Sequence, residues 1–112
     1  MGSEGSGVRW LYHVLSVADD LGDPFAPPSL AVEGFIHCSF LPLVAESARR
    51  YFAPGARLRV LRIDPARVGA KIEIASTPRG PMPHVLGAIP RSAIVETLTL
   101  DALAGAPDFV TS

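Results

Sequence analysis

The three histidines of this chain are the side chains best suited to chemistry. His13 lies in an apolar stretch, His37 precedes Cys38 and Ser39, and His84 follows a proline-rich segment. A neutral imidazole can donate one hydrogen bond and accept another, and its charge changes between about pH 5 and 8. The alternative for each histidine is a structural role, in which backbone groups satisfy the ring nitrogens.

Residues 34–40 (Gly-Phe-Ile-His-Cys-Ser-Phe) form a short apolar run with polar side chains in its middle. In an extended strand alternate side chains share a face, so Phe35, His37 and Ser39 are expected on one face and Cys38 on the other. His37 therefore cannot activate Cys38, which we expect to be a buried, inert thiol. Ser39 is either a nucleophile or a hydroxyl that orients a ligand.

A metal site built from the three histidines is the next alternative, because imidazole is a good ligand for zinc, iron and copper. The chain has one cysteine, and it has no H-x-H or H-x-x-x-H pair that would begin such a site. We therefore expect no bound metal.

Composition limits the class of protein. The 112 residues suffice for one domain, expected at residues 8–112, after a glycine- and serine-rich tail at residues 1–7 that we expect to be disordered. The net charge of −1 argues against a nucleic-acid partner. With no signal peptide and no apolar run of about 20 residues, we expect no membrane association, a cytoplasmic location, and a monomer or weak dimer.

The elements that must position the histidines are short strands around one helix. Apolar residues at spacings of three and four predict a helix over residues 43–52, which ends before Pro54 and Gly55. Short helical turns are expected at residues 18–21 and 30–33.

Three prolines and a glycine predict a rigid surface loop at residues 76–83. In the strand before it, Ile72 and Ile74 are expected to face inward. Alternating or continuous apolar runs predict strands at residues 8–15, 34–40, 57–63, 71–75, 84–89 and 93–100. The predicted fold is an α+β domain with a small mixed or antiparallel sheet of five to six strands and one main helix.

A family resemblance extends from residue 10 to residue 97. It is carried by Leu-Tyr-His at residues 11–13, Glu-Gly-Phe-Ile-His-Cys-Ser at residues 33–39, Leu-Arg-Ile-Asp-Pro at residues 61–65 and Pro-His at residues 83–84. In these blocks the chain closely resembles the bacterial domain-of-unknown-function family 952. That family in turn resembles a compact, remote relative of the ADP-ribosyltransferase fold.

The resemblance implies an NAD cofactor or a similar nucleotide ligand. It implies catalytic roles for His13, His37 and His84, and it implies that Tyr12, His13, Ser39 and Phe52 bind the cofactor. The chain departs from the family at Leu86, where an aromatic residue often follows the Pro-His pair. It also departs from the transferase pattern because no acidic residue is evidently placed as the catalytic glutamate. Glu73 is the nearest candidate, on a face predicted to be exposed.

Two function hypotheses follow. In the first, the domain is an enzyme that transfers ADP-ribose from NAD to an acceptor or to water. In the second, it is a non-catalytic ligand-binding module on the same fold. For either function we expect the rings of His13, His37 and His84 to converge on one pocket, although 24 and 47 residues separate them along the chain.

Overall fold

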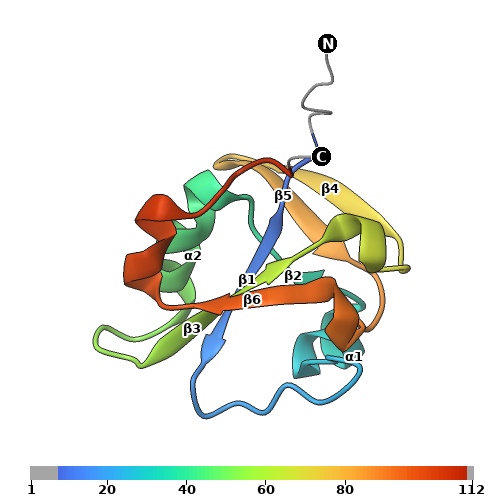
Figure 1. The fold of residues 1–112 in the computed structure, drawn as a ribbon, viewed down its shortest axis with the longest axis horizontal. Helices are drawn as coiled ribbons and strands as arrows, with labels where there is room; N and C mark the ends of the chain where they lie inside the picture. Colours follow the sequence, from blue (N-terminus) through green and yellow to red (C-terminus); the bar gives the residue numbers. More distant parts are fainter. Residues whose placement is uncertain (1–7, 111–112) are drawn as a thin grey trace.

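Two small antiparallel sheets and one main helix form the body of the molecule (Figure 1). The computed structural model describes residues 8–110, and the tail expected at residues 1–7 lies outside them. The first sheet has the order β1–β3–β6, with β1 at Leu11–Ser16, β3 at Leu58–Ile63 and β6 at Ile94–Leu98. The second has the order β2–β5–β4, with β2 at Ile36–His37, β5 at Gly80–Val85 and β4 at Ile72–Thr77. The α+β class is therefore confirmed, whereas the single sheet is wrong, because the six strands divide between two.

Apolar side chains on both faces of β1 and β3 explain why the first sheet lies in the middle of the molecule. Leu11, Leu15 and Leu61 belong to the main core cluster, which also contains Ile36 and Val85 of the second sheet. On the opposite face, a smaller cluster of Tyr12, Val44 and Val60 packs against the C-terminal turn η4, at Leu100–Gly105. His13 has the same parity along β1 as Leu11 and Leu15, so it lies on the face toward the second sheet.

The stretch at residues 34–40 passes from one sheet to the other. Its β2 portion is only two residues long and pairs with β5. The Cys38 N–H still donates to the Pro83 carbonyl of the second sheet, but Ser39 exchanges two backbone hydrogen bonds with Tyr12 of the first. The predicted seven-residue strand is thus a crossover, and it brings His37 next to β1.

Proline misled the prediction at residues 76–83, which form a β-hairpin rather than a loop. β4 and β5 pair in register from Ile72 opposite Val85 to Thr77 opposite Gly80. The Pro83 carbonyl faces β2, where it accepts from Cys38, so the missing N–H of Pro83 also faces β2. The backbone hydrogen bonds between β4 and β5 are made by the alternate residues of β5, so the prolines do not interrupt them.

The helix predicted at residues 43–52 is confirmed as α2, Val44–Tyr51, preceded by the turn η1 at Leu41–Leu43. The turn expected at residues 30–33 is found within α1, Pro28–Glu33, which ends at Gly34 with φ of 87°. That backbone conformation favours glycine. The helical turn expected at residues 18–21 is absent from the structure, which has an ordinary turn there.

Two strand predictions need further correction. Ile74 is 54 % exposed on β4, which is an edge strand, so its prediction as an inward-facing residue was wrong. The strand expected at residues 84–89 ends as β5 at Val85, and Ile89 instead forms an isolated bridge with Phe25.

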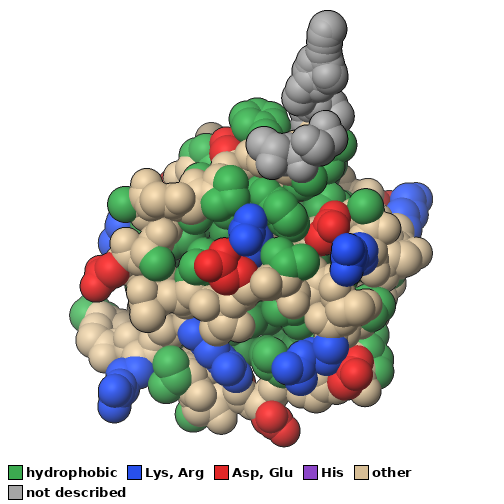
Figure 2. Space-filling model, viewed as in Figure 1, with side chains coloured by type: hydrophobic (Ala, Val, Ile, Leu, Met, Phe, Trp, Pro, Cys, Tyr) green, Lys and Arg blue, Asp and Glu red, His purple; other side chains and the backbone are tan. Residues whose placement is uncertain are grey.

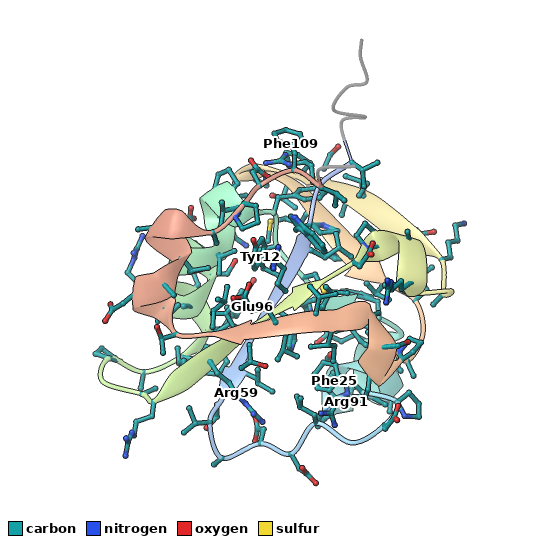
Figure 3. The ribbon with its side chains drawn as sticks, viewed as in Figure 1. Tyr12, Phe25, Arg59, Arg91, Glu96 and Phe109 are labelled. Atoms are coloured by element: carbon teal, nitrogen blue, oxygen red, sulfur yellow. The ribbon has the colours of Figure 1, made fainter. Side chains whose placement is uncertain are left out.

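The two ends of the described part of the chain are held beside each other by a bidentate ion pair between Arg9 and Asp108 at 2.9 Å. Figure 3 shows Tyr12 in the interior and Phe109 at this end of the molecule. Charged side chains of both signs are scattered over the face in Figure 2. Among the described residues, no helix has the length and apolar character needed to cross a membrane.

Candidate functional site

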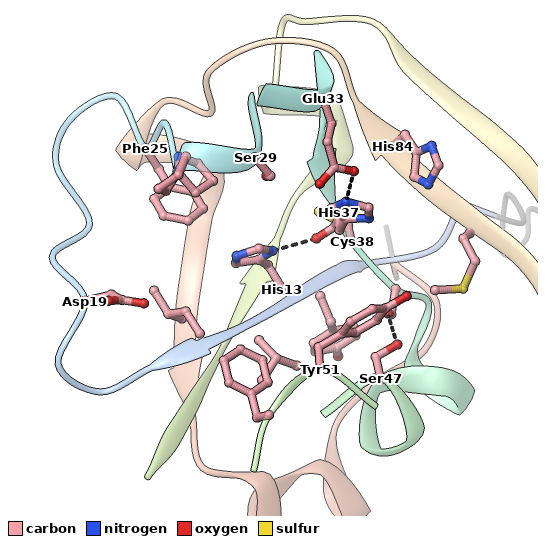
Figure 4. A pocket seen from close by; sticks show the side chains of 18 of the residues that line it. His13, Asp19, Phe25, Ser29, Glu33, His37, Cys38, Ser47, Tyr51 and His84 are labelled. Carbon is pink, nitrogen blue, oxygen red and sulfur yellow. Dashed lines mark hydrogen bonds and ion pairs between the residues drawn. The ribbon is translucent and has the colours of Figure 1, made fainter. Parts of the chain in front are cut away.

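A cavity of about 820 Å³ opens between the two sheets and the helices (Figure 4). Its walls come from β1, the long loop after β1, α1, the crossover at residues 37–39, α2 and the β4–β5 hairpin. The polar and aromatic side chains that line it include His13, Asp19, Asp20, Phe25, Ser29, Glu33, His37, Ser39, Ser47, Tyr51, Phe52, Thr77, Arg79 and His84. The structure thus brings the three predicted histidines into one cavity.

His13 is held in one tautomer by the backbone of the crossover. Its Nδ1 atom lies 2.6 Å from the carbonyl oxygen of His37. A carbonyl can only accept a hydrogen bond, so Nδ1 carries the proton and, in the neutral ring, Nε2 has a free lone pair. His13 is therefore oriented to act as a base or as a hydrogen-bond acceptor through Nε2.

Burial keeps that ring neutral. Desolvation lowers the pKa of His13 below its ordinary value of 6.5, and the hydrogen bond to the His37 carbonyl only partly opposes this effect. The Phe25 ring packs edge-on against the His13 ring, with 5.2 Å between the ring centroids. Phe25 is itself fixed by two backbone hydrogen bonds with Ile89.

A carboxylate accompanies His37 in the cavity. The Nε2 atom of His37 lies 2.7 Å from Oε1 of Glu33, and both side chains are nearly half exposed. Because a carboxylate only accepts, Nε2 of His37 carries a proton in this contact. Glu33 is the last residue of α1, and Gly34 turns the chain so that His37 comes back to meet it.

His84 lies next to His37 across the β2–β5 pairing. The centroids of the two rings are 5.6 Å apart, and the His84 ring stacks on Phe35 at 4.0 Å. Burial, and secondarily the neighbouring His37, lower the pKa of His84 from its ordinary value. His84 was predicted to begin a strand, and it lies instead near the end of β5.

Ser39 is buried and bonded to a second serine. Its hydroxyl lies 2.9 Å from that of Ser47 on α2, and the two residues are 5 % and 6 % exposed. Cys38 is also buried, and desolvation raises the pKa of its thiol to about 12, so at neutral pH it is not a nucleophile. The contact between Ser39 and Ser47 therefore favours a structural role for both hydroxyls, which orient α2 against β1, over a role for Ser39 as an activated nucleophile.

The other two predicted cofactor-binding residues differ in what they offer a ligand. Phe52 lines the cavity and is partly exposed. Tyr12 is fully buried, and its hydroxyl donates to the Pro107 carbonyl at 2.5 Å. Burial raises the pKa of Tyr12 to about 12. Tyr12 also lines the cavity, but its hydroxyl is already bonded in the core, so it offers a ligand its ring rather than a free polar group.

Four charged residues of the cavity were missed in the sequence: Asp19, Asp20, Glu33 and Arg79. Glu33 lines the cavity and contacts His37, whereas Glu73, which pairs with His84 across β4 and β5, is exposed and does not line the cavity. The four-residue spacing from Glu33 to His37 was the available signal. Arg79 also lines the cavity, from the hairpin turn that was predicted to be a surface loop.

No group of three or more potential metal ligands occurs among residues 8–110. The side chains of the cavity offer a neutral imidazole with a free nitrogen, a histidine–carboxylate pair, two further carboxylates and one guanidinium, together with aromatic rings.

Comparisons with known proteins identify the family of the chain. The solved structure of protein CC0527 from Caulobacter crescentus matches with a TM-score of 0.72 and 22 % identity, over 85 % of this chain and 98 % of that protein. A double mutant of CC0527 gives the same values. At this identity the likeness shows a shared fold. A search of proteins with curated functions finds no significant match. The model of the family described as "protein of unknown function (DUF952)" matches residues 16–97, and the chain belongs to that family.

Proposed function

We propose that the cavity binds a nucleotide of the NAD class and that the domain transfers its ADP-ribosyl group to an acceptor or to water. The observation that carries the proposal is the state of His13, a neutral ring with its proton fixed on Nδ1 and Nε2 free, in the same cavity as the Glu33–His37 pair. The cavity therefore holds a base and a carboxylate, which a step of this class requires.

The size and lining of the cavity suit such a substrate. A volume of about 820 Å³ is near the upper end of the range for small-molecule sites, where a dinucleotide fits better than a single small metabolite. Phe25, Tyr51 and Phe52 supply aromatic surface for flat bases. Hydroxyls and carboxylates among the lining residues provide partners for ribose hydroxyls.

In the proposed reaction the bond between ribose C1′ and the pyridinium nitrogen breaks, and its electron pair leaves on neutral nicotinamide. The acceptor oxygen forms a new bond to C1′ and gives up its proton to Nε2 of His13. The carboxylate of Glu33 stabilises the positive charge that develops on the ribose, and His37 orients that carboxylate through their 2.7 Å hydrogen bond. Atoms and charge balance with water or any hydroxyl as the acceptor.

The expected remote likeness of this family to the ADP-ribosyltransferase fold supports the same substrate class by analogy. In that superfamily a histidine on one strand and a polar residue on a second lie beside the nicotinamide ribose. His13 on β1 and His37 on β2 are in adjoining segments here, joined by the hydrogen bond from the His13 ring to the backbone of His37.

The test is the release of nicotinamide from NAD by the full chain, followed by chromatography. Glu33→Gln keeps the size of the side chain and removes its charge, and it should lower the rate by roughly a hundredfold or more. Glu96→Gln makes the same change on β6, at an exposed, ion-paired glutamate outside the cavity lining, and is the matched control. Equal rates in the two variants, or no release by the unmodified protein with candidate acceptors present, would overturn the enzymatic proposal.

A non-catalytic binding module is the second candidate, and one observation favours it. The Glu33 carboxylate is 47 % exposed and already accepts a hydrogen bond from His37, so its charge is partly neutralised. A module of this kind would bind NAD and ADP-ribose with similar affinity and release no nicotinamide. Saturable binding without turnover would therefore select the module over the enzyme.

A further inference from the structure

The positive and negative side chains of the cavity lie in different parts of its wall. Arg79 is the one permanent cation among the described residues that line it, whereas Asp19, Asp20 and Glu33 are acidic. Arg79 contacts Tyr51, and Figure 4 shows Tyr51 and Asp19 on opposite sides of His13. A ligand that complements the charges at both ends of the cavity must itself be asymmetric, with its negative charge near Arg79.

The hairpin turn fixes the backbone of Arg79. Thr77 and Gly80 are paired across the turn, with Pro78 and Arg79 as its two central residues. The Thr77 hydroxyl donates to the Gly80 carbonyl at 2.7 Å and accepts from the Arg79 N–H at 3.2 Å. Pro78 further restricts the turn because its φ is fixed. Arg79 is thus held on a short, closed loop at the cavity wall.

The guanidinium of Arg79 is only partly satisfied by the protein. Its Nη2 donates to the Tyr51 hydroxyl at 3.3 Å, which is a long hydrogen bond. Its Nη1 is 3.7 Å from a carboxylate oxygen of Glu46, and it is buried without a hydrogen-bond partner. Nη1 itself is closed to solvent and faces Glu46, but the Arg79 side chain is 20 % exposed, so other atoms of the guanidinium remain open to a ligand.

We infer that Arg79, with the Tyr51 hydroxyl beside it, is a phosphate-binding subsite of the cavity and sets the direction in which the ligand lies. The guanidinium offers a permanent positive charge and the N–H donors of Nη2 to phosphate oxygens, and the tyrosine hydroxyl can offer one more hydrogen bond. The inference rests on the proposed function for the identity of the nucleotide, but it requires only a phosphorylated ligand.

If the ligand is NAD, its pyrophosphate lies at Arg79. The cationic pyridinium is then directed toward the carboxylate of Glu33 and the acidic loop that carries Asp19 and Asp20. This direction brings opposite charges together at both ends of the cavity. It also leaves the ribose between them, near Nε2 of His13.

Binding by the full chain should be measured by calorimetry with ADP-ribose and with adenosine, which differ in the pyrophosphate and second ribose. Inorganic pyrophosphate and ribose 5-phosphate are additional probes without a base. Arg79→Gln should weaken ADP-ribose binding by roughly tenfold to a hundredfold and leave adenosine binding within about twofold. Arg79→Lys keeps the charge and should recover part of the loss.

Arg49→Gln is the matched control, because Arg49 is an exposed arginine of α2 outside the cavity lining. Circular dichroism and the melting temperature confirm that each variant is folded.

If Arg79→Gln and Arg49→Gln bind ADP-ribose equally well, the phosphate subsite is wrong, while NAD-class binding stands. If the unmodified protein binds only the probes without a base, and Arg79→Gln abolishes that binding, the subsite is right and the nucleotide proposal is wrong. If the unmodified protein binds none of the phosphorylated probes, both are wrong.

Discussion

The ring of His13 donates a hydrogen bond from Nδ1 to the backbone carbonyl of His37, across a distance of 2.6 Å. This bond joins β1 to the crossover between the two sheets and fixes which nitrogen of His13 carries the proton. It therefore links a structural role of His13 with a chemical one, and substitutions can separate the two.

Asparagine and alanine at position 13 should have different effects. The amide nitrogen of Asn can take the place of Nδ1 and keep the hydrogen bond to the His37 carbonyl, whereas Ala leaves that carbonyl unpaired. We expect His13→Asn to stay within about 1 kcal/mol of the natural stability and His13→Ala to lose about 1–3 kcal/mol. Both should abolish nicotinamide release, because both remove Nε2. Urea unfolding and the NAD assay measure the two effects, and activity in the Asn variant would contradict the assigned role of Nε2.

Stability should fall as the pH falls through about 6.5. Burial lowers the folded-state pKa of His13 and of His84, whereas both titrate near 6.5 when unfolded. Between the folded and unfolded pKa values the unfolded chain binds more protons, so the free energy of unfolding rises with pH. This stability is fully present above the unfolded pKa and is lost below it.

The measurement is the urea midpoint at about pH 7.5 and about pH 5.5. The double variant His13→Asn with His84→Gln should show a smaller decrease between the two pH values than the natural chain. An equal decrease of the urea midpoint in both proteins would mean that groups other than His13 and His84 cause the pH dependence of stability.

Cys38 should react slowly with thiol reagents in the native protein. The side chain is buried and its pKa is raised to about 12 by desolvation, so both access and thiolate are lacking. Labelling should become rapid only in denaturant. Cys38→Ala should leave nicotinamide release unchanged, and a loss of activity in a folded Ala variant would show that the thiol takes part.

The hydroxyls of Ser39 and Ser47 should be energetically coupled. Each is the polar partner of the other at 2.9 Å, and both are buried. Removing one hydroxyl leaves the other unpaired, so each single alanine variant should cost about 1–3 kcal/mol, and the double variant should cost less than the sum. A double-mutant cycle by urea unfolding measures the coupling. Strict additivity would mean that the two hydroxyls act independently.

Local patterns predicted those elements whose signals were themselves local. The spacing of apolar residues predicted α2, and Gly34 predicted the end of α1. The prolines in β5 gave the opposite signal, since Pro81 and Pro83 favour a loop when read alone. Only the pairing partners show that the missing N–H of Pro83 faces β2 rather than β4.

The site was predictable to the extent that strand alternation controls it. Alternation predicted the separation of Cys38 from His37, and the structure has the thiol buried and the imidazole exposed. The division into two sheets could not be predicted, because it depends on Ser39 pairing with Tyr12 at long range. Arg79 was missed for the same reason: its place at the cavity follows from the hairpin, which the prolines concealed.

The central claim is best tested by NMR of the three histidine rings in the ¹⁵N-labelled full chain, before and after addition of NAD. The chain has only these three histidines, so each ring can be assigned by single substitution. At neutral pH, we expect His13 to be the neutral Nδ1–H tautomer. As NAD binds at one site, we expect the Nε2 resonance of His13 and the ring resonances of His37 and His84 to shift saturably. An Nε2–H tautomer for His13, or ring resonances that do not respond to a large excess of NAD, would contradict the account.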